Sequence, residues 1–231
     1  MAGAKGCAPV HGSDAMYRAT PFLLPLGLAL AACQTAAVRP PASAGATVTL
    51  EEPEGWRRTA TAAGIAAVDA LDSRWITALA EVRRRGGGRA VTAEGPLLDP
   101  AAALARAAPA PGPYRCRMLR VAAPGGRTRG LTVSRSGFCF IGVEGDQLSL
   151  TSEVAGYRLG GYLYETGSTT RLIFLGASAP ARGRAAGYGE DPTRDAAGRF
   201  ERVDEFRYRL ILPAAAGPEL QVFELIPAPA G

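Results

Sequence analysis

The sequence is almost without histidine and lysine, and both absences exclude classes of chemistry. Its one histidine is His11 and its one lysine is Lys5, close to the start of the 231 residues. If residues 1–32 are removed, as argued below, the remaining chain has neither residue, and it then has no Ser-His-Asp or Cys-His catalysis, no histidine zinc site and no HExxH motif. Schiff-base chemistry and a phosphate-binding lysine are excluded as well. An enzyme built on the remaining residues would depend on carboxylate, serine or tyrosine chemistry.

The sequence also lacks an apolar run that is long enough to cross a membrane. The run at 21–32, PFLLPLGLALAA, has 12 residues, whereas a membrane-spanning helix needs about 20. Arg18 precedes this run, and the small residues Ala31 and Ala32 end it. A secretory signal peptide has this same order: a positive charge, then a short apolar run, then small residues.

Residues 30–33, LAAC, resemble the lipobox of bacterial lipoproteins. The resemblance implies that residues 1–32 are removed and that Cys33 becomes the lipidated first residue, since several acyl chains anchor a protein durably. An ordinary signal peptide with an incidental cysteine, or a buried apolar helix, are the alternatives. Met16 is an alternative start, because residues 1–15 are unusually polar for a signal peptide.

The predicted lipoprotein has two parts after the signal peptide. Residues 33–53 are rich in Ala, Pro, Ser and Thr and predict a lipid anchor with a flexible tether. Residues 54–231 have the length of one α+β domain. The resemblance implies a location on the periplasmic side of a membrane, and Gln34 in place of an aspartate favours the outer membrane over the inner one.

The net charge does not indicate a nucleic-acid partner. It is +5 at pH 7 and falls to +4 without Lys5, Arg18 and Asp14. Arginines alternate with acidic residues along most of the chain, and the cluster at 83–85 fits a solvated helix end better than a lipid-binding patch. We therefore expect no nucleic acid among the partners.

Two cysteines follow Cys33, namely Cys116 and Cys139. An even number of cysteines in an oxidising compartment predicts one disulfide, and both residues lie in strand-like segments. A catalytic or metal-binding role is the alternative, but the sequence has no CxxC motif and no suitable histidine beside them. We expect neither a metal nor a cofactor.

Apolar residues recur every three or four positions between Ile65 and Val82, and they predict one long helix over about 60–85. The Ala- and Pro-rich stretch 86–113 predicts a connector. From Tyr114 onward the apolar residues alternate, which predicts an antiparallel meander of eight strands within 114–227. These strands are expected at 114–122, 131–143, 147–154, 157–165, 170–176, 198–203, 206–212 and 220–226. Closure into a lipocalin-like barrel, complete or partial, would remove the exposed edges, and an open sheet or sandwich is the second choice.

The segment 188–213 contains the most specific motif. It reads YGEDPTRDAAGRFERVDEFRYRLILP, and it follows a Trp-containing helix and a YRCR strand. In this combination the chain resembles a bacterial envelope family known as domain of unknown function 4893, over roughly residues 55–227. The resemblance implies a location and a fold, and the family has no assigned activity.

Charged residues of the same segment form a candidate functional or structural cluster: Tyr188, Asp191, Arg194, Asp195, Glu201 and Arg202. Asp191, Thr193 and Asp195 match three places of a calcium loop, but Ala196 stands where that loop needs glycine, and Arg202 where it needs glutamate. Two of the carboxylates could serve a glycosidase. The favoured interpretation is a turn in which Asp191 and Asp195 accept backbone hydrogen bonds and the arginines pair with acids.

Two functional hypotheses follow. The first is a non-catalytic binding or structural module that presents a face or pocket to a periplasmic protein, such as a protease, or to a small hydrophobic ligand. The second is a carboxylate-dependent hydrolase of envelope glycan. Aromatic residues could line a ligand cavity, although core packing is their more common role: Tyr157, Tyr162, Tyr164, Phe174, Phe206 and Tyr208.

Overall fold

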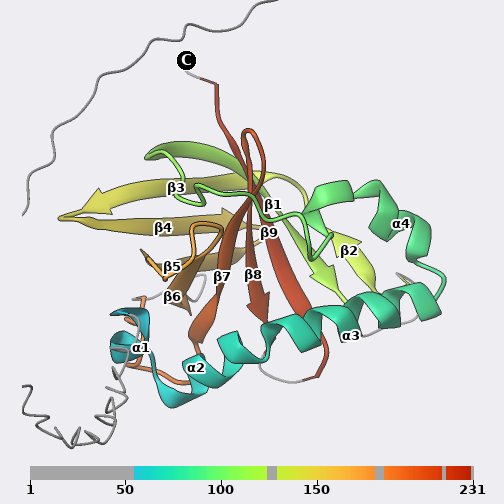
Figure 1. Cartoon of the computed structure of the whole chain (residues 1–231), viewed down its shortest axis with the longest axis horizontal. Helices are drawn as coiled ribbons and strands as arrows, with labels where there is room; N and C mark the ends of the chain where they lie inside the picture. The colour runs from blue at the N-terminus through green and yellow to red at the C-terminus, as the bar shows by residue number, and fades with distance from the viewer. Residues whose placement is uncertain (1–54, 124–128, 180–184, 215–216, 230–231) are drawn as a thin grey trace, which may run out of the picture. The chain divides into compact units, whose positions relative to one another are not determined.

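The computed structural model describes residues 55–123, 129–179, 185–214 and 217–229. In this part of the chain, an antiparallel β-barrel carries short helices on one side (Figure 1). The predicted signal peptide, Cys33 and the tether lie outside the described residues.

Eight of the described strands close into the predicted barrel. Neighbours pair antiparallel in the order β1, β3, β4, β5, β6, β7, β8, β9, and β9 pairs with β1 to complete the ring. The bounds of all strands are β1 (Gly112–Val121), β2 (Leu131–Val133), β3 (Gly137–Glu144), β4 (Gln147–Val154), β5 (Tyr157–Tyr164), β6 (Leu172–Ala179), β7 (Asp195–Asp204), β8 (Arg207–Pro213) and β9 (Leu220–Pro227).

The strand predicted at 131–143 is two strands. β2 pairs with the last residues of β1, from Leu119 to Val121, while β3 pairs with its first half. Between them Ser134 both donates its backbone N–H to the carbonyl of Met118 and accepts the Met118 N–H through its hydroxyl. A side chain thus replaces a ladder bond at this point and ends the strand.

The single long helix predicted over 60–85 is wrong. The structure has α1 (Gly55–Thr59), α2 (Ala62–Asp69) and α3 (Leu71–Arg84) instead. Thr61 starts α2 as its N-cap, because its hydroxyl accepts the N–H of Gly64. α2 ends at Asp69, and Ala70 is both its C-cap and the N-cap of α3. The apolar repeat was real, but the break lets α2 and α3 pack against different strands.

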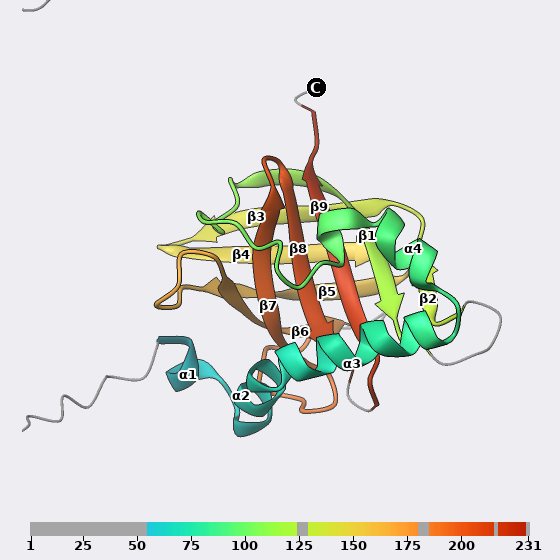
Figure 2. The ribbon, with the colours of Figure 1, turned by 45° about the vertical axis from the view of Figure 1, so that its right-hand side comes forward.

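The helices cover the outer face of one side of the barrel (Figure 2). Trp56 of α1 packs with Ile173 and Leu175 of β6. α3 buries Leu71, Trp75, Ala78, Leu79 and Val82 against outward-pointing residues of β1, β8 and β9. The predicted connector contains α4 (Gly88–Ala93) and the 3-10 helix η1 (Gly95–Leu97), and its later part bonds to β7 through the N–H of Leu104.

The barrel interior is filled by apolar side chains. Phe174, Phe200 and Phe223 are fully buried in it, and the ring of Tyr208 stacks on that of Phe200 with centroids 5.7 Å apart. Of the six aromatic residues suggested above as a ligand lining, Phe174 and Tyr208 belong to this core and Tyr157 packs against it. Tyr164 packs beside Trp56 on the outer face, while Tyr162 and Phe206 are exposed. These six side chains do not converge on one cavity.

The predicted disulfide is confirmed. Cys116 of β1 and Cys139 of β3 are bonded, with their Cα atoms 5.9 Å apart, and both are buried in the barrel interior. The bond joins two neighbouring strands next to the closure of the barrel by β9.

Candidate functional site

A row of alternating charges crosses the outer face of four neighbouring strands. Glu201 of β7 lies opposite Arg209 of β8, Arg209 lies opposite Glu224 of β9, and Glu224 lies opposite Arg117 of β1. Successive side chains of a strand point to opposite faces. Because their sequence neighbours fill the barrel interior, these four residues point outward, and we call them the charge row. Opposite charges on directly paired residues attract one another.

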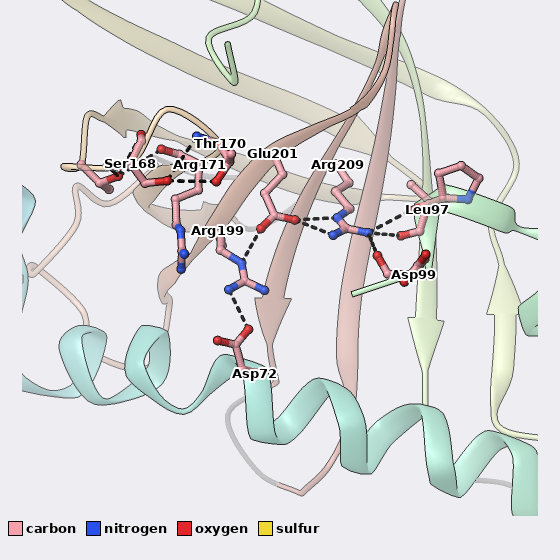
Figure 3. A network of polar contacts seen from close by, with 11 residues as sticks. Asp72, Leu97, Asp99, Ser168, Thr170, Arg171, Arg199, Glu201 and Arg209 are labelled. Atoms are coloured by element: carbon pink, nitrogen blue, oxygen red, sulfur yellow. Dashed lines mark hydrogen bonds and ion pairs between the residues drawn. The ribbon is translucent and has the colours of Figure 1, made fainter. Parts of the chain in front are cut away.

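Glu201 is the most heavily paired carboxylate of the charge row. Its side chain is 3 % exposed. Arg209 Nε donates to its Oε2 over 2.7 Å, and Arg199 Nε lies 2.7 Å from its Oε1 (Figure 3). Both oxygens are therefore occupied by guanidinium groups.

Arg209 is buried, with 0 % of its side chain exposed. Its Nη1 donates to the carbonyl oxygens of Pro96, Leu97 and Asp99, at 2.9, 3.2 and 2.7 Å. The ring of Trp75 lies 4.5 Å from its guanidinium carbon. Burial lowers the pKa of Arg209, and Glu201 opposes that shift. The connector thus lies over the barrel, where its carbonyl oxygens accept hydrogen bonds from the buried guanidinium group. These bonds offset the free-energy cost of burying the cation.

The network reaches the helices through Arg199. Its Nη1 donates to Asp72 Oδ1 in the first turn of α3 over 2.7 Å. Figure 3 shows the chain of contacts from Asp72 through Arg199 and Glu201 to Arg209. Ion pairs therefore link α3, β7 and β8, and hydrogen bonds from Arg209 extend the network to the connector.

The other end of the charge row is also paired. Glu224 accepts hydrogen bonds from Arg117 and Arg207, and Arg117 donates to Glu94 at the end of α4 over 2.6 Å. Burial raises the pKa of Glu224, but the hydrogen bonds and charges of the two arginines outweigh it, so the pKa lies below its ordinary value.

A cleft of about 440 Å³ opens beside Arg199, between the helices and β6. Its polar lining consists of Arg57, Asp69, Asp72, Thr166, Ser168, Arg171 and Arg199, with Trp56, Val68 and Ile173 among the remaining residues. Arg57 Nη2 donates to Asp69 Oδ1 over 2.7 Å across one wall. We call it the outer cleft; its volume is within the range of small-molecule sites.

The loop between β5 and β6 forms one wall of the outer cleft and is held by its own hydroxyl groups. Ser168 N–H donates to Thr166 Oγ1 over 3.0 Å, and Thr170 N–H donates to Ser168 Oγ over 3.2 Å. The Thr169 carbonyl accepts the N–H of Ala107 from the connector. Such side-chain-to-backbone bonds order a turn locally.

The residues predicted as a cluster do not come together: three of them form a turn, one belongs to the charge row, and two bind other segments. Asp191 accepts the N–H of Thr193 at 3.0 Å and lies 3.1 Å from Arg194 Nε, and Asp195 accepts the N–H of Gly189 at 2.8 Å. Hydrogen bonds from Thr193, and the charge of Arg194, lower the pKa of Asp191.

The remaining predicted residues bind other segments. The Tyr188 hydroxyl accepts the N–H of Thr61 at 3.2 Å, and Arg202 donates to the carbonyl of Ala105 at 2.7 Å. Arg202 thus bonds a carbonyl of the connector rather than an acid. Of the six, Glu201 is the one in the charge row, and none of the six lines the outer cleft.

Sequence reasoning missed Asp72, Arg171, Arg199 and Arg209. A signal was present, because charged residues alternate with aromatic or aliphatic ones in RFE at 199–201 and in RYRL at 207–210. Alternation of this kind is normally produced by a strand with one solvated face. In this protein the connector and the helices cover that face. The alternation in the sequence does not reveal this cover.

Comparison with known families supports the resemblance noted from the motifs. The pattern of the family described as "Domain of unknown function (DUF4893)" matches residues 56–225. The protein belongs to this family. The DUF4893 match contains the whole charge row and every residue that lines the outer cleft. No curated protein and no solved structure shows a significant match to the chain.

Two findings on the DUF4893 domain concern membranes and metals. Among the described helices, none combines the length and apolar character that a membrane span requires. Within the described ranges, no three residues of the His, Cys, Asp and Glu types are grouped so that they could hold a metal ion.

Proposed function

We propose that this DUF4893 protein is a lipid-anchored protein of the bacterial envelope that acts as a non-catalytic binding module. Cys33 carries the lipid, and the tether to residue 53 joins the domain at α1. The domain faces the periplasm, with the outer membrane favoured over the inner one. The support for anchoring is the order of Arg18, the apolar run at 21–32 and Cys33 in the sequence.

The observation that carries the binding function is the outer cleft beside a buried ionic network. Desolvating Arg199, Glu201 and Arg209 is costly, and replacing such groups by apolar residues is often neutral or stabilising. Stability alone therefore gives little reason for this arrangement. It fixes α3 and β7 beside the outer cleft, as a binding site requires of its supporting residues. The filled barrel interior serves as the scaffold.

The hydrolase alternative has weaker support. Both oxygens of Glu201 contact arginines, and Asp191 and Asp195 accept hydrogen bonds from their own turn. None of these carboxylates lines the outer cleft. A glycosidase needs two carboxyl groups that flank a substrate, and these three are engaged in holding the fold.

The anchor is tested with Cys33→Ser in the native host, with Cys7→Ser as the matched control. We expect the Cys33→Ser protein to leave the membrane fraction under mild salt, whereas the control stays bound. Mass spectrometry of the control should show a lipidated N-terminus at Cys33. An unmodified N-terminus, or retention of Cys33→Ser in membranes, would contradict the anchor.

The choice between binding module and hydrolase is tested with Asp195→Asn. Under the binding hypothesis this variant unfolds at slightly lower urea, because a charged acceptor of the Gly189 N–H becomes neutral, and neither protein releases sugars from purified envelope glycan. Turnover by the wild type that is lost in a fully folded Asp195→Asn variant would establish the hydrolase instead.

A further inference from the structure

The register of β6 and β7 extends the charge row to a fifth strand. Leu172 of β6 pairs with Phe200 of β7, so the preceding residue, Arg171, falls in line with Glu201. Arginine and glutamate then alternate across five strands, and Arg171 is the last member. Unlike the others, it lies at the end of the β5–β6 loop and is exposed.

Arg171 has no counter-charge among the residues that the structure describes. Glu201 is taken by Arg199 and Arg209, and the Arg171 guanidinium has neither a hydrogen-bond nor an ion-pair partner among the described residues. The ion pairs around the charge row contain four arginines and four carboxylates, so their charges balance: Arg117, Arg199, Arg207 and Arg209 against Asp72, Glu94, Glu201 and Glu224. Arg171 adds one positive charge to this balanced arrangement.

This unpaired charge faces the outer cleft. Arg171 and Arg199 both line it, and Figure 3 shows their side chains extending from the strands toward the helix layer. The hydroxyl-bonded loop fixes the backbone on the N-terminal side of Arg171. A ligand there meets an ordered wall, so less conformational freedom is lost on binding.

The remaining charges of the outer cleft select among anions. Asp69 and Asp72 line the same space and are paired with Arg57 and Arg199. A monoanion neutralises the charge of Arg171, whereas a dianion such as hydrogen phosphate leaves one negative charge unbalanced near the two aspartates. A carboxylate also matches the planar, two-pronged geometry of a guanidinium group.

We propose that the outer cleft binds a ligand through its carboxylate group, with Arg171 as the residue that recognises it. This inference rests on the proposed binding function and names its ligand class. The carboxylate can belong to the C-terminus of a short peptide or to an acidic sugar. In both cases the rest of the ligand lies toward Trp56 and Ile173, the apolar part of the lining.

The test is a calorimetric titration of the full chain in detergent. The probes are N-acetyl-alanyl-alanine and its C-terminal amide, glucuronate and glucose, and inorganic phosphate. We expect one of the two carboxylate probes to bind at least about tenfold more tightly than its uncharged counterpart, as for a charge-assisted hydrogen bond. Which of the two binds identifies the source of the carboxylate. Phosphate should bind more weakly than that carboxylate probe.

Two variants assign the effect to the site. Arg171→Gln should weaken binding about tenfold and leave the urea unfolding midpoint unchanged, because the side chain is exposed and has no partner within the described ranges. Arg115→Gln, an exposed arginine on β1 that does not line the outer cleft, is the control and should bind like the wild type.

The outcomes that would contradict the carboxylate site differ from those that would contradict the proposed function. Equal binding of acid and amide, unchanged binding by Arg171→Gln, tighter binding of phosphate, or no binding of any probe would overturn the carboxylate site. None of these affects the lipid anchor, which Cys33→Ser decides. Cleavage of the peptide probe, detected by mass spectrometry after the titration, would instead overturn the non-catalytic function.

Discussion

The barrel interior and the outer layer beneath the helices are both buried, but they are built from opposite chemistry. The interior contains Leu, Ile, Phe and Tyr side chains together with the disulfide. The outer layer places Arg199, Glu201, Arg209 and Glu224 beneath α3 and the connector. Sequence neighbours such as Phe200 and Glu201 belong to different regions because they point to opposite faces of one strand.

The two regions therefore have different roles: the apolar interior stabilises the fold, and the ionic outer layer positions the helices and the connector. An apolar interior tolerates changes in shape that keep its volume. Ion pairs need defined geometry and partners, so the outer layer fixes where the helices and connector sit. The outer cleft adjoins this layer, and we therefore place binding there rather than inside the barrel.

The largest effect is expected from Glu201→Ala in the outer layer. The change leaves Arg199 and Arg209 buried without their carboxylate, which should lower the free energy of unfolding by about 3–5 kcal/mol. Urea denaturation measures this loss. Glu153→Ala, at an exposed position of β4, is the matched control and should cost less than about 0.5 kcal/mol. Equal effects of the two changes would remove the distinction between an ionic layer and an ordinary surface.

A somewhat smaller loss, about 3 kcal/mol, is expected from Leu210→Ala in the interior, next in sequence to Arg209. The same denaturation series applies. Leu210→Met should cost under about 1.5 kcal/mol, because it nearly conserves volume. If Leu210→Met destabilised as much as Leu210→Ala, the interior would depend on exact geometry as the outer layer does.

Tyr188→Phe is expected to cost about 1 kcal/mol, because the Thr61 N–H at the start of α2 loses its acceptor. The loss should be local. Hydrogen exchange should accelerate at residues 62–69 and remain unchanged in β3 and β4. Uniform acceleration over the whole domain would show that this contact supports the barrel as well as the helix.

The smallest effect on stability is expected from the protonation of Glu224, which occurs only in acid. Its pKa in the folded protein lies below the ordinary value of 4.5, after the arginines overcome burial. The ion pairs therefore contribute fully above about pH 4.5, and stability falls as the pH drops from there through the folded pKa. Urea midpoints between pH 7 and pH 3 should show this decline. Glu224→Gln should have a shallower one, and an identical slope in both proteins would contradict the role of Glu224.

The sequence was sufficient for the barrel but not for the outer layer. Alternating residues from Tyr114 onward predict strands because most of the interior residues are apolar. They do not show that Arg209 is buried, since its cover comes from carbonyls at Pro96, Leu97 and Asp99, more than 100 residues earlier. Glu201 was predicted as a candidate, but its partner Arg209 depends on strand register. The break of the predicted helix at Ala70 likewise depends on packing that periodicity does not contain.

The most direct test of binding outside the barrel is an NMR titration of the full chain with the carboxylate probe that binds. Arginine Nε–Hε signals report on Arg171 and Arg199, and leucine methyl signals of Leu150 and Leu163 report on the interior. We predict shifts of the two arginine signals and of Trp56, with the interior methyl signals unchanged. Shifts of the interior methyl groups without any change at Arg171 would contradict the account.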